Sequence, residues 1–286
     1  MQIRKVTQSD SIDLFSWRND ELSRSMFKNT SLLNMEEHSK WFEASIIDPN
    51  KYFLIGIKDK EKIGVCRFDL KTDKNIAEVS ININPELRAR GFGREVLKKS
   101  LMKFKDKFKF DIVANVRRKN IASIKVFERC GFYFTEKSEE YISLRSKTPT
   151  NFDPETGIFL EKNINTPKQI NILYQLLNQR THSISHENMP SFLEHEKFVV
   201  SNPYRVWYLI FLKTKCVGSF YIQDDNSIGL NTNNLDVQKL NFCINYIKTN
   251  YCPLPEEKSK IPDYFYLNAP HSDKNYLSML DKLNLK

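Results

Sequence analysis

Apolar side chains recur at two different periods along this chain of 286 residues, and each change of period marks a new element. In SIDLFSWRNDELSRSMF (residues 11–27) and NMEEHSKWFEASI (34–46) they return every three or four positions, which predicts two short amphipathic helices. Apolar and β-branched runs follow in YFLIGIKDKEKIGVCRFDL (52–70) and IAEVSININ (76–84), interrupted by charged turns, and predict three antiparallel strands.

The later part of the first half alternates less regularly. We expect a helix from Arg94 to about Lys107, a strand in FDIVANV (110–116), and a second helix in NIASIKVFERC (120–130) that ends at Gly131. FYFTEKSEEYIS then forms a hairpin. This order lacks the strand and helix alternation of a doubly wound fold, so it predicts an α/β (α+β) domain with a mixed, mostly antiparallel twisted sheet flanked by helices.

The same pattern starts again in the second half of the chain. NILYQLLNQR resembles SIDLFSWRND, and LEHEKF resembles MEEHSKWF. Pro203 precedes Gly218 by 15 positions, which is also the distance from Pro49 to Gly64. Three matches in the same order predict that the fold is duplicated in tandem.

A stretch rich in proline and glycine separates the two halves. We expect domains at residues 1–147 and 164–286, joined by a linker at 148–163. The second domain would be degenerate, because NTNNLDVQKLNFC stands where the first half has PELRARGFGREVL, and it has no glycine and no basic cluster. Near the end, NAPHSDKNYLSMLDKLNL faintly resembles NVRRKNIASIKVFERCGF.

Positive charge is concentrated in the first half. The net charge is +9, and residues 1–147 hold 30 Lys and Arg against 21 Asp and Glu, whereas the remaining residues hold 14 of each. This excess favours an anionic ligand of the first domain, although surplus surface lysine is a common cause of such a value. The lysine-rich KKSLMKFKDKFKF fits a solvated helix face, so we expect no nucleic-acid partner.

Other features of the sequence exclude several classes of protein. No apolar run approaches the roughly 18 residues of a membrane span, and the start lacks the apolar core of a secretion signal, which predicts a cytoplasmic protein without a membrane partner. The five cysteines form no CxxC pair and are expected to be reduced. His182, His186 and His195 lack metal-ligand spacing, so no metal is expected.

The segment RARGFG, residues 88–93, carries the strongest chemical signal. Two glycines between a strand and a helix free the backbone N–H groups of a helix N-terminus to bind an anion such as a pyrophosphate. The spacing fits neither a nucleoside-triphosphate loop nor a dinucleotide loop. A purely structural turn is the alternative.

The surroundings of this loop resemble the GNAT superfamily of acyl-CoA-dependent N-acyltransferases. The resemblance rests on the strand AEVSININP before the loop, Asn120-x-x-Ser123 at the start of a helix, and ERCGF at its end, and it covers residues 1 to about 145. It implies acetyl-CoA as acyl donor. The coenzyme would then contact Ile81, Ile83, Arg88, Ala89, Arg90, Gly91, Phe92, Gly93, Arg94, Asn120, Ser123 and Phe127.

Within the superfamily, the segment with WRND, NMEEHSKWF and IGVCRFD resembles the enzymes that acetylate the 4-amino group of nucleotide-linked amino sugars, as in pseudaminic-acid-type pathways of surface polysaccharide biosynthesis. This implies a small-molecule acceptor, a nucleotide sugar. The acceptor would contact Trp17, Arg18, Met26, Phe27 and His38. Ordinary helix packing is the alternative for the apolar members, whereas a charge such as Arg18 within an apolar helix face requires a partner.

The resemblance also implies direct transfer to the amine, with Glu78 as general base and His38 as the alternative base. Relatives often place a tyrosine acid where this chain has Phe127, so Ser123 or water would protonate the thiolate, or the proton that leaves the amine would reach it directly. Glu78 paired with a surface lysine is the structural alternative. A non-catalytic coenzyme A or sugar-nucleotide sensor, or an enzyme acting on protein N-termini or antibiotics, remains open, as does a role of the second half as an internal pseudo-dimer or in a homodimer.

Overall fold

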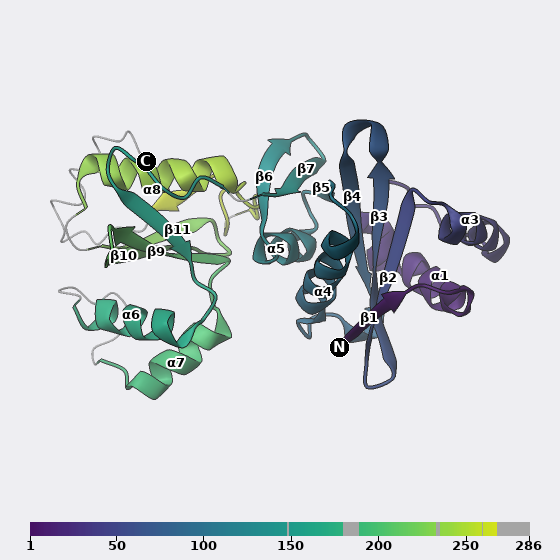
Figure 1. Cartoon of the computed structure of the whole chain (residues 1–286), viewed down its shortest axis with the longest axis horizontal. Coiled ribbons are helices and arrows are strands. Elements are labelled where there is room, and N and C mark those ends of the chain that lie inside the picture. The colour runs from purple at the N-terminus through teal and green to yellow at the C-terminus, as the bar shows by residue number, and fades with distance from the viewer. Residues whose placement is uncertain (148, 180–188, 233–234, 259, 268–286) are drawn as a thin grey trace. The chain divides into compact units, whose positions relative to one another are not determined.

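The computed structural model describes residues 1–147, 149–179, 189–232, 235–258 and 260–267. The chain divides into two compact units, Met1–Thr148 and Pro149–Lys286 (Figure 1). Within the described ranges, no helix is both long and apolar enough to cross a bilayer.

The first unit is built on a seven-stranded sheet in the order β1-β2-β3-β4-β5-β7-β6. Neighbouring strands are antiparallel except for β4 and β5, which run parallel. This confirms the predicted mixed, mostly antiparallel sheet; β1 is too short to show a period in the sequence. The strands are β1 (Gln2–Lys5), β2 (Lys51–Lys58), β3 (Glu61–Lys71), β4 (Ile76–Ile83), β5 (Asp111–Arg117), β6 (Phe132–Lys137) and β7 (Tyr141–Ser146).

The helices of the first unit differ from the prediction at one place. The single helix expected over residues 11–27 is interrupted at Asp20, whose backbone is extended (φ −54°, ψ 135°) and whose side chain accepts the Ser23 N–H to cap a new helix. The helices are α1 (Ser11–Asn19), α2 (Glu21–Met26), α3 (Met35–Ile47), α4 (Phe92–Lys107) and α5 (Ile121–Arg129), with short 3-10 turns at Gln8–Asp10, Thr72–Lys74 and Pro85–Leu87.

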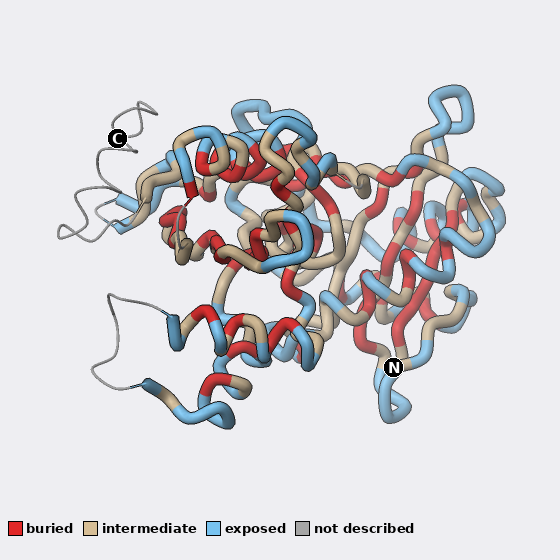
Figure 2. Tube along the Cα trace, turned by 60° about the vertical axis from the view of Figure 1, so that its left-hand side comes forward, coloured by how far each residue is buried: buried red, intermediate tan, exposed pale blue. Residues whose placement is uncertain are grey.

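Helices cover both faces of this sheet (Figure 1). On one face Phe53 of β2 packs with Trp17 of α1 and Phe42 of α3. On the other face the rings of Phe68 in β3 and Phe104 in α4 stack with their centroids 4.1 Å apart. Because successive side chains of a strand point to opposite faces, β2 and β3 supply both cores, and Figure 2 shows the buried positions along them.

The second unit contains a five-stranded sheet in the order β12-β11-β10-β9-β8. Its strands are antiparallel except for β11 and β12, which are parallel. The elements are β8 (Ile158–Lys162), α6 (Pro167–Asn178), α7 (Phe192–Ser201), β9 (Val206–Leu212), β10 (Lys215–Ile222), β11 (Ser227–Thr232), α8 (Val237–Asn250) and β12 (Tyr266–Leu267).

This arrangement corrects the predicted linker. The segment 148–163 contains β8, which pairs along its length with β9 and is therefore an edge strand of the second sheet. The unit boundary falls at residue 148, so the part that connects the units is shorter than its proline content indicated. The weak similarity noted at residues 268–285 lies outside the described residues.

One buried hydrogen bond occurs at corresponding positions of the two units. His38, the fourth residue of α3, donates from Nε2 to the carbonyl oxygen of Ser11 (3.0 Å). His195, the fourth residue of α7, donates from Nε2 to the carbonyl oxygen of Ile170 (3.1 Å). Both acceptors lie four residues after a threonine that forms a capping box. The histidine therefore ties the same pair of helices together in each unit.

The two units also correspond to each other in their cores and in one close contact between neighbouring strands. A Cβ atom at Gly64 would lie 2.8 Å from the carbonyl oxygen of Asn82, and one at Gly218 would lie 2.5 Å from that of Asn231, so both positions require glycine. In the described residues, the elements from β8 to β12 follow the order of those from β1 to β5, without a counterpart of α2. The corresponding core pairs are Leu14 and Leu173, Trp17 and Leu176, Phe42 and Val199, Phe53 and Trp207, and Ile55 and Leu209.

Candidate active site

The first unit contains a fork between β4 and β5. The two strands pair only at Ile76–Asp111, Ala77–Ile112 and Glu78–Val113, although β4 continues to Ile83 and β5 to Arg117. On its other edge β4 remains paired with β3 up to Ile83. Beyond Glu78 the backbone of β4 is therefore open on the β5 side, where an extended ligand can form hydrogen bonds.

The loop between β4 and α4 has the backbone conformation of an anion site. Ala89 (φ +60°) and Gly91 (φ +77°) are both left-handed, two positions apart, and Gly91 is the N-cap of the 16-residue helix α4. Such a sequence turns successive N–H groups to one side, at the positive end of the helix dipole. A Cβ atom at Gly91 would find no atom within 4 Å, so the space next to this position is open.

Gly93, in the first turn of α4, is not required by the protein's own packing. A Cβ atom there would make ordinary contacts with Val126 (3.4 Å) and Ile83 (3.7 Å). Because Gly93 has no side chain, the backbone in the first turn of α4 is left uncovered at this position. Other predicted cofactor residues surround this turn: Ala89, Arg90 and Arg94 are exposed, and Ile81, Ile83 and Phe92 are half-buried.

The Arg88 side chain makes a contact that the sequence did not indicate. Its Nη2 donates to Asp20 Oδ2 (2.6 Å) and to Ser23 Oγ (2.7 Å), at the start of α2. Burial raises the pKa of Asp20, but the hydrogen bonds from Arg88 and the Ser23 N–H outweigh it and the net direction is downward. The guanidinium thus fastens the loop to α2, and its side chain is committed to that carboxylate.

At the start of α5, Asn120 caps the helix as predicted. Its Oδ1 accepts the Ser123 N–H (3.1 Å), and Ser123 is half-buried in the first turn. Phe127 does not fit a cofactor contact, because it is 2% exposed and packs edge-on against Phe132 with ring centroids 5.0 Å apart. Phe127 lies one helical turn after Ser123 and faces the core.

Glu78 lies where the fork begins. Its Oε1 accepts from Asn115 Nδ2 (3.1 Å) and its Oε2 pairs with Lys71 Nζ (2.9 Å). Ser143 Oγ donates to Asn115 Oδ1 (2.7 Å), which orients the amide nitrogen toward Glu78. Burial raises the pKa of Glu78, but Asn115 and Lys71 lower it and the net direction is downward. The carboxylate is thus ionised and held at the base of the fork.

His38 does not reach this site. It is 2% exposed, and its ring lies against Phe15, Trp41 and Phe42. Burial lowers its pKa, with the bond to the Ser11 carbonyl opposing the shift, so the ring is neutral. This burial disagrees with the predicted base and acceptor-binding roles and fits a structural one.

The other predicted acceptor residues are of two kinds, buried in the core or half-buried near the end of α2. Trp17 is 4% exposed and belongs to the core between α1, α3 and the sheet, which is the packing alternative. Met26 and Phe27, at the end of α2, are half-buried. Arg18 stacks on the Phe27 ring (4.4 Å from guanidinium carbon to centroid), and its Nη1 is buried without a hydrogen-bond partner among the described residues.

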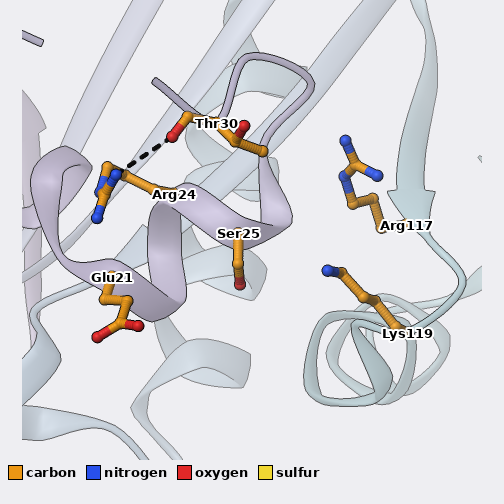
Figure 3. Close-up of a pocket in the computed structure, with 6 residues that line it drawn as sticks. All are labelled: Glu21, Arg24, Ser25, Thr30, Arg117 and Lys119. Atoms are coloured by element: carbon orange, nitrogen blue, oxygen red, sulfur yellow. Dashed lines mark hydrogen bonds between the residues drawn. The ribbon is translucent and has the colours of Figure 1, made fainter. Parts of the chain in front are cut away.

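A pocket of about 260 Å³ lies between α2 and the end of β5 (Figure 3). Arg117 Nε donates to the Phe27 carbonyl oxygen (3.2 Å), which connects the two walls. The basic residues Arg117, Arg118 and Lys119 at the end of β5 are visible in the sequence, but sequence spacing gives no reason to connect them with α2. The lining residues are Glu21, Arg24, Ser25, Thr30, Arg117 and Lys119.

An open strand fork beside an anion-binding loop at a helix N-terminus suits a nucleotide that carries an extended arm, which is the class of acyl-CoA-dependent transferases. Residues 1–133 match the family model described as an acetyltransferase (GNAT) domain. This part of the chain therefore matches a GNAT acetyltransferase domain. Among the described residues, no group of three His, Cys, Asp or Glu side chains could hold a metal ion.

Several solved structures are similar in fold to about half of the chain. A domain from Methanocaldococcus jannaschii DSM 2661 has 25% identity, covers 50% of this chain and 97% of its own, and has a TM-score of 0.43. The spermidine N-acetyltransferase of Vibrio cholerae in complex with CoA and spermine has 18% identity, coverages of 50% and 92%, and a TM-score of 0.44. The ribosomal-protein-alanine N-acetyltransferase of Brucella melitensis has 20% identity, coverages of 51% and 96%, and a TM-score of 0.43. No curated protein matches the chain.

The structural role of His38 leads to a pH prediction. The pKa of His38 is lowered in the folded state from its ordinary value of 6.5, so its contribution to stability is complete above that value and is lost as the pH falls below it. We expect His38→Gln to lower the free energy of unfolding at pH 7 by about 1 kcal/mol, to weaken the fall in thermal midpoint between about pH 7 and pH 5, and to leave turnover intact.

Thermal unfolding and turnover of the same preparations check this. His195→Gln is the matched control, because His195 makes the corresponding bond in the second unit and its pKa is also lowered by burial. A large loss of turnover in a stably folded His38→Gln variant would instead restore a chemical role for this histidine.

Proposed function

We propose that the first unit transfers the acetyl group of acetyl-CoA directly to the amino group of a nucleotide-linked amino sugar. The observation that carries the proposal is the fork between β4 and β5 beside the left-handed pair Ala89 and Gly91. These features supply the two things an acyl-CoA requires, which are N–H groups for the pyrophosphate and a free strand edge for the pantetheine arm.

Different residues around the fork would bind different parts of the coenzyme. The N–H groups of residues 89–93 would bind the pyrophosphate, and the backbone of Ile81 to Ile83 would pair with the arm. Bound acetyl-CoA supplies an activated thioester carbonyl. The arm would then enter the fork toward Glu78, where the strands join.

The chemistry that these residues support is direct attack. The acceptor nitrogen forms a bond to the acetyl carbon as the carbon–sulfur bond breaks. Glu78, held ionised by Asn115 and Lys71, accepts the proton that the nitrogen loses. The thiolate takes a proton from the Ser123 hydroxyl or from water, because Phe127 has no proton to give.

The charge of the acceptor side supports an anionic acceptor. Arg18 has a buried, unpartnered Nη1, and burial lowers its pKa, followed by the repulsion of Arg24 and Arg67. Such a group of cations repels a polyamine and favours an amine that also carries a phosphate.

We also propose that the second unit is a degenerate copy of the first that has no coenzyme A site. Among its described residues, the elements follow the order from β1 to β5 without a counterpart of α2, but its sequence between β11 and α8 contains no glycine and no basic cluster. One chain would then bind one acetyl-CoA.

The test is coenzyme A release by the full chain with acetyl-CoA and a panel of UDP-linked 4-amino-4,6-dideoxy sugars, aminoglycosides, peptides and spermidine, with calorimetric titration of acetyl-CoA alongside. We expect turnover on a UDP-amino sugar and one acetyl-CoA site per chain. Binding without turnover on any amine would favour the sensor alternative. Two sites per chain would contradict the degenerate second copy.

A further inference from the structure

The pocket between α2 and β5 lies on the α1 side of the fork. Asn82, at the open end of β4, donates from Nδ2 to the Trp17 carbonyl oxygen (3.0 Å) and accepts from Ser23 Oγ (3.0 Å). At the end of β5, Arg117 reaches the Phe27 carbonyl oxygen. Helix α2 and the residue after it therefore bridge the two diverging strands, and the pocket opens beside that bridge (Figure 3).

Three of the six residues that line the pocket are cations. Arg117 is fixed before any ligand arrives, because its Nη1 pairs with Glu140 (3.0 Å) and its guanidinium lies over the Tyr141 ring (5.1 Å). Among the described residues, Arg24 donates to two backbone carbonyls, that of Asn19 from Nε (3.1 Å) and that of Thr30 from Nη1 (3.3 Å).

Positive charge is in excess in this pocket. Neither Arg24 nor Lys119 forms an ion pair with any residue that the structure describes. Lys119 is exposed and comes just before Asn120, the N-cap of α5. The single carboxylate of the lining is Glu21, which is exposed. Arg24 on the α2 wall and Lys119 on the β5 wall (Figure 3) thus keep positive charge that an anion in the pocket would neutralise.

The size of the pocket limits what it can hold. Its volume of about 260 Å³ lies below the usual range for a whole drug-sized ligand, roughly 300–1,000 Å³, but accommodates a phosphate or diphosphate group. The hydroxyl groups of Ser25 and Thr30 add polar atoms to the wall. The remainder of a larger ligand would extend out of the pocket.

We infer that this pocket, with Arg24, Arg117 and Lys119, binds the phosphate group of the acceptor and selects anionic amines over polyamines. The inference rests on the proposed transfer to an amine, and it names the residues that recognise the other end of that acceptor. With its phosphate fixed on the α1 side, the acceptor can direct its amine into the fork toward Glu78. The phosphates of coenzyme A have the same chemistry, so an experiment must separate the two sources.

The probe is UDP, with inorganic pyrophosphate as a second probe, titrated calorimetrically into the full chain saturated with acetyl-CoA. We expect Lys119→Glu to weaken UDP binding by at least about 10-fold and Arg24→Gln to weaken it similarly, with acetyl-CoA affinity unchanged. Lys109→Glu is the matched control, since Lys109 is exposed just before the opposite end of β5, and it should bind both ligands like the wild type.

Equal UDP binding by wild type and Lys119→Glu would overturn the inference. So would a loss of acetyl-CoA affinity in Lys119→Glu, because the pocket would then serve the coenzyme. If no amine is ever acetylated but UDP binding still depends on Lys119 and Arg24, the transfer is wrong and the anion site stands. If a UDP-amino sugar is acetylated as well by Lys119→Glu as by wild type, the transfer stands and the assignment of the pocket fails.

Discussion

Glu78→Gln should lower kcat/KM for the amine acceptor by about 10²–10³-fold and leave acetyl-CoA binding unchanged. The glutamine amide has the size of the glutamate side chain and can still form hydrogen bonds with Asn115 and Lys71, but it cannot accept the proton of the attacking nitrogen. The loss should therefore fall on turnover. Steady-state kinetics and calorimetry on the same preparation measure the two quantities.

The pH profile distinguishes a base from a structural carboxylate. Only the ionised form accepts a proton, so kcat/KM falls as the pH drops through the pKa of Glu78, which lies below its ordinary value of 4.5. Lys71→Met removes a cation 2.9 Å away and should move this acid limb to higher pH. An unmoved acid limb, or a similar loss of turnover in the control Glu136→Gln on the exposed part of β6, would argue against Glu78 as the base.

Gly91→Glu should weaken acetyl-CoA binding by more than about 100-fold and so abolish turnover at ordinary substrate concentrations. The substitution places a carboxylate in the space where the loop turns its N–H groups, and it forces a residue with a Cβ atom into φ +77°. Charge repulsion supplies most of this effect, because the left-handed strain alone costs roughly 1–2 kcal/mol.

The chain offers a matched control for this strain. Gly157 has φ +70°, and a Cβ atom there would make only an ordinary contact with Leu212 (3.7 Å), but it belongs to the second unit. Gly157→Glu should therefore be strained in the same way and keep its acetyl-CoA affinity. Comparable losses of affinity in both variants would show that strain alone is responsible, and RARGFG would then be only a turn.

The local elements could be predicted because their causes are local. Asn120 caps α5 because a short polar side chain can accept the N–H three residues ahead, and Gly131 ends it because glycine tolerates a positive φ. Both causes are visible in the residue types. The division of one expected helix into α1 and α2 escaped the periodicity, because the interruption is confined to one residue, Asp20, through its backbone and its capping side chain.

The candidate site could be predicted only where a single segment forms it. The loop from Arg88 to Gly93 was evident from its glycines, whereas the residues that meet across the sheet were not. The contact of His38 with Ser11 and that of Arg88 with Asp20 each depend on a neighbour from a distant part of the chain. Residue type could not indicate which of these side chains remain free for a ligand.

By itself, the sequence indicated most of the helices and strands, because periodicity and turn chemistry act between residues close in the chain. The tandem repetition and the anion-binding loop are predictions made from the same signals. Only the tertiary structure decided that β4 and β5 separate after Glu78, and that α2 and β5 enclose a basic pocket. Those features depend on strand register and on contacts between segments far apart in sequence, such as that of Asn82 with Trp17. Such contacts form only when the chain has packed, since they satisfy groups that no neighbour in the sequence can reach.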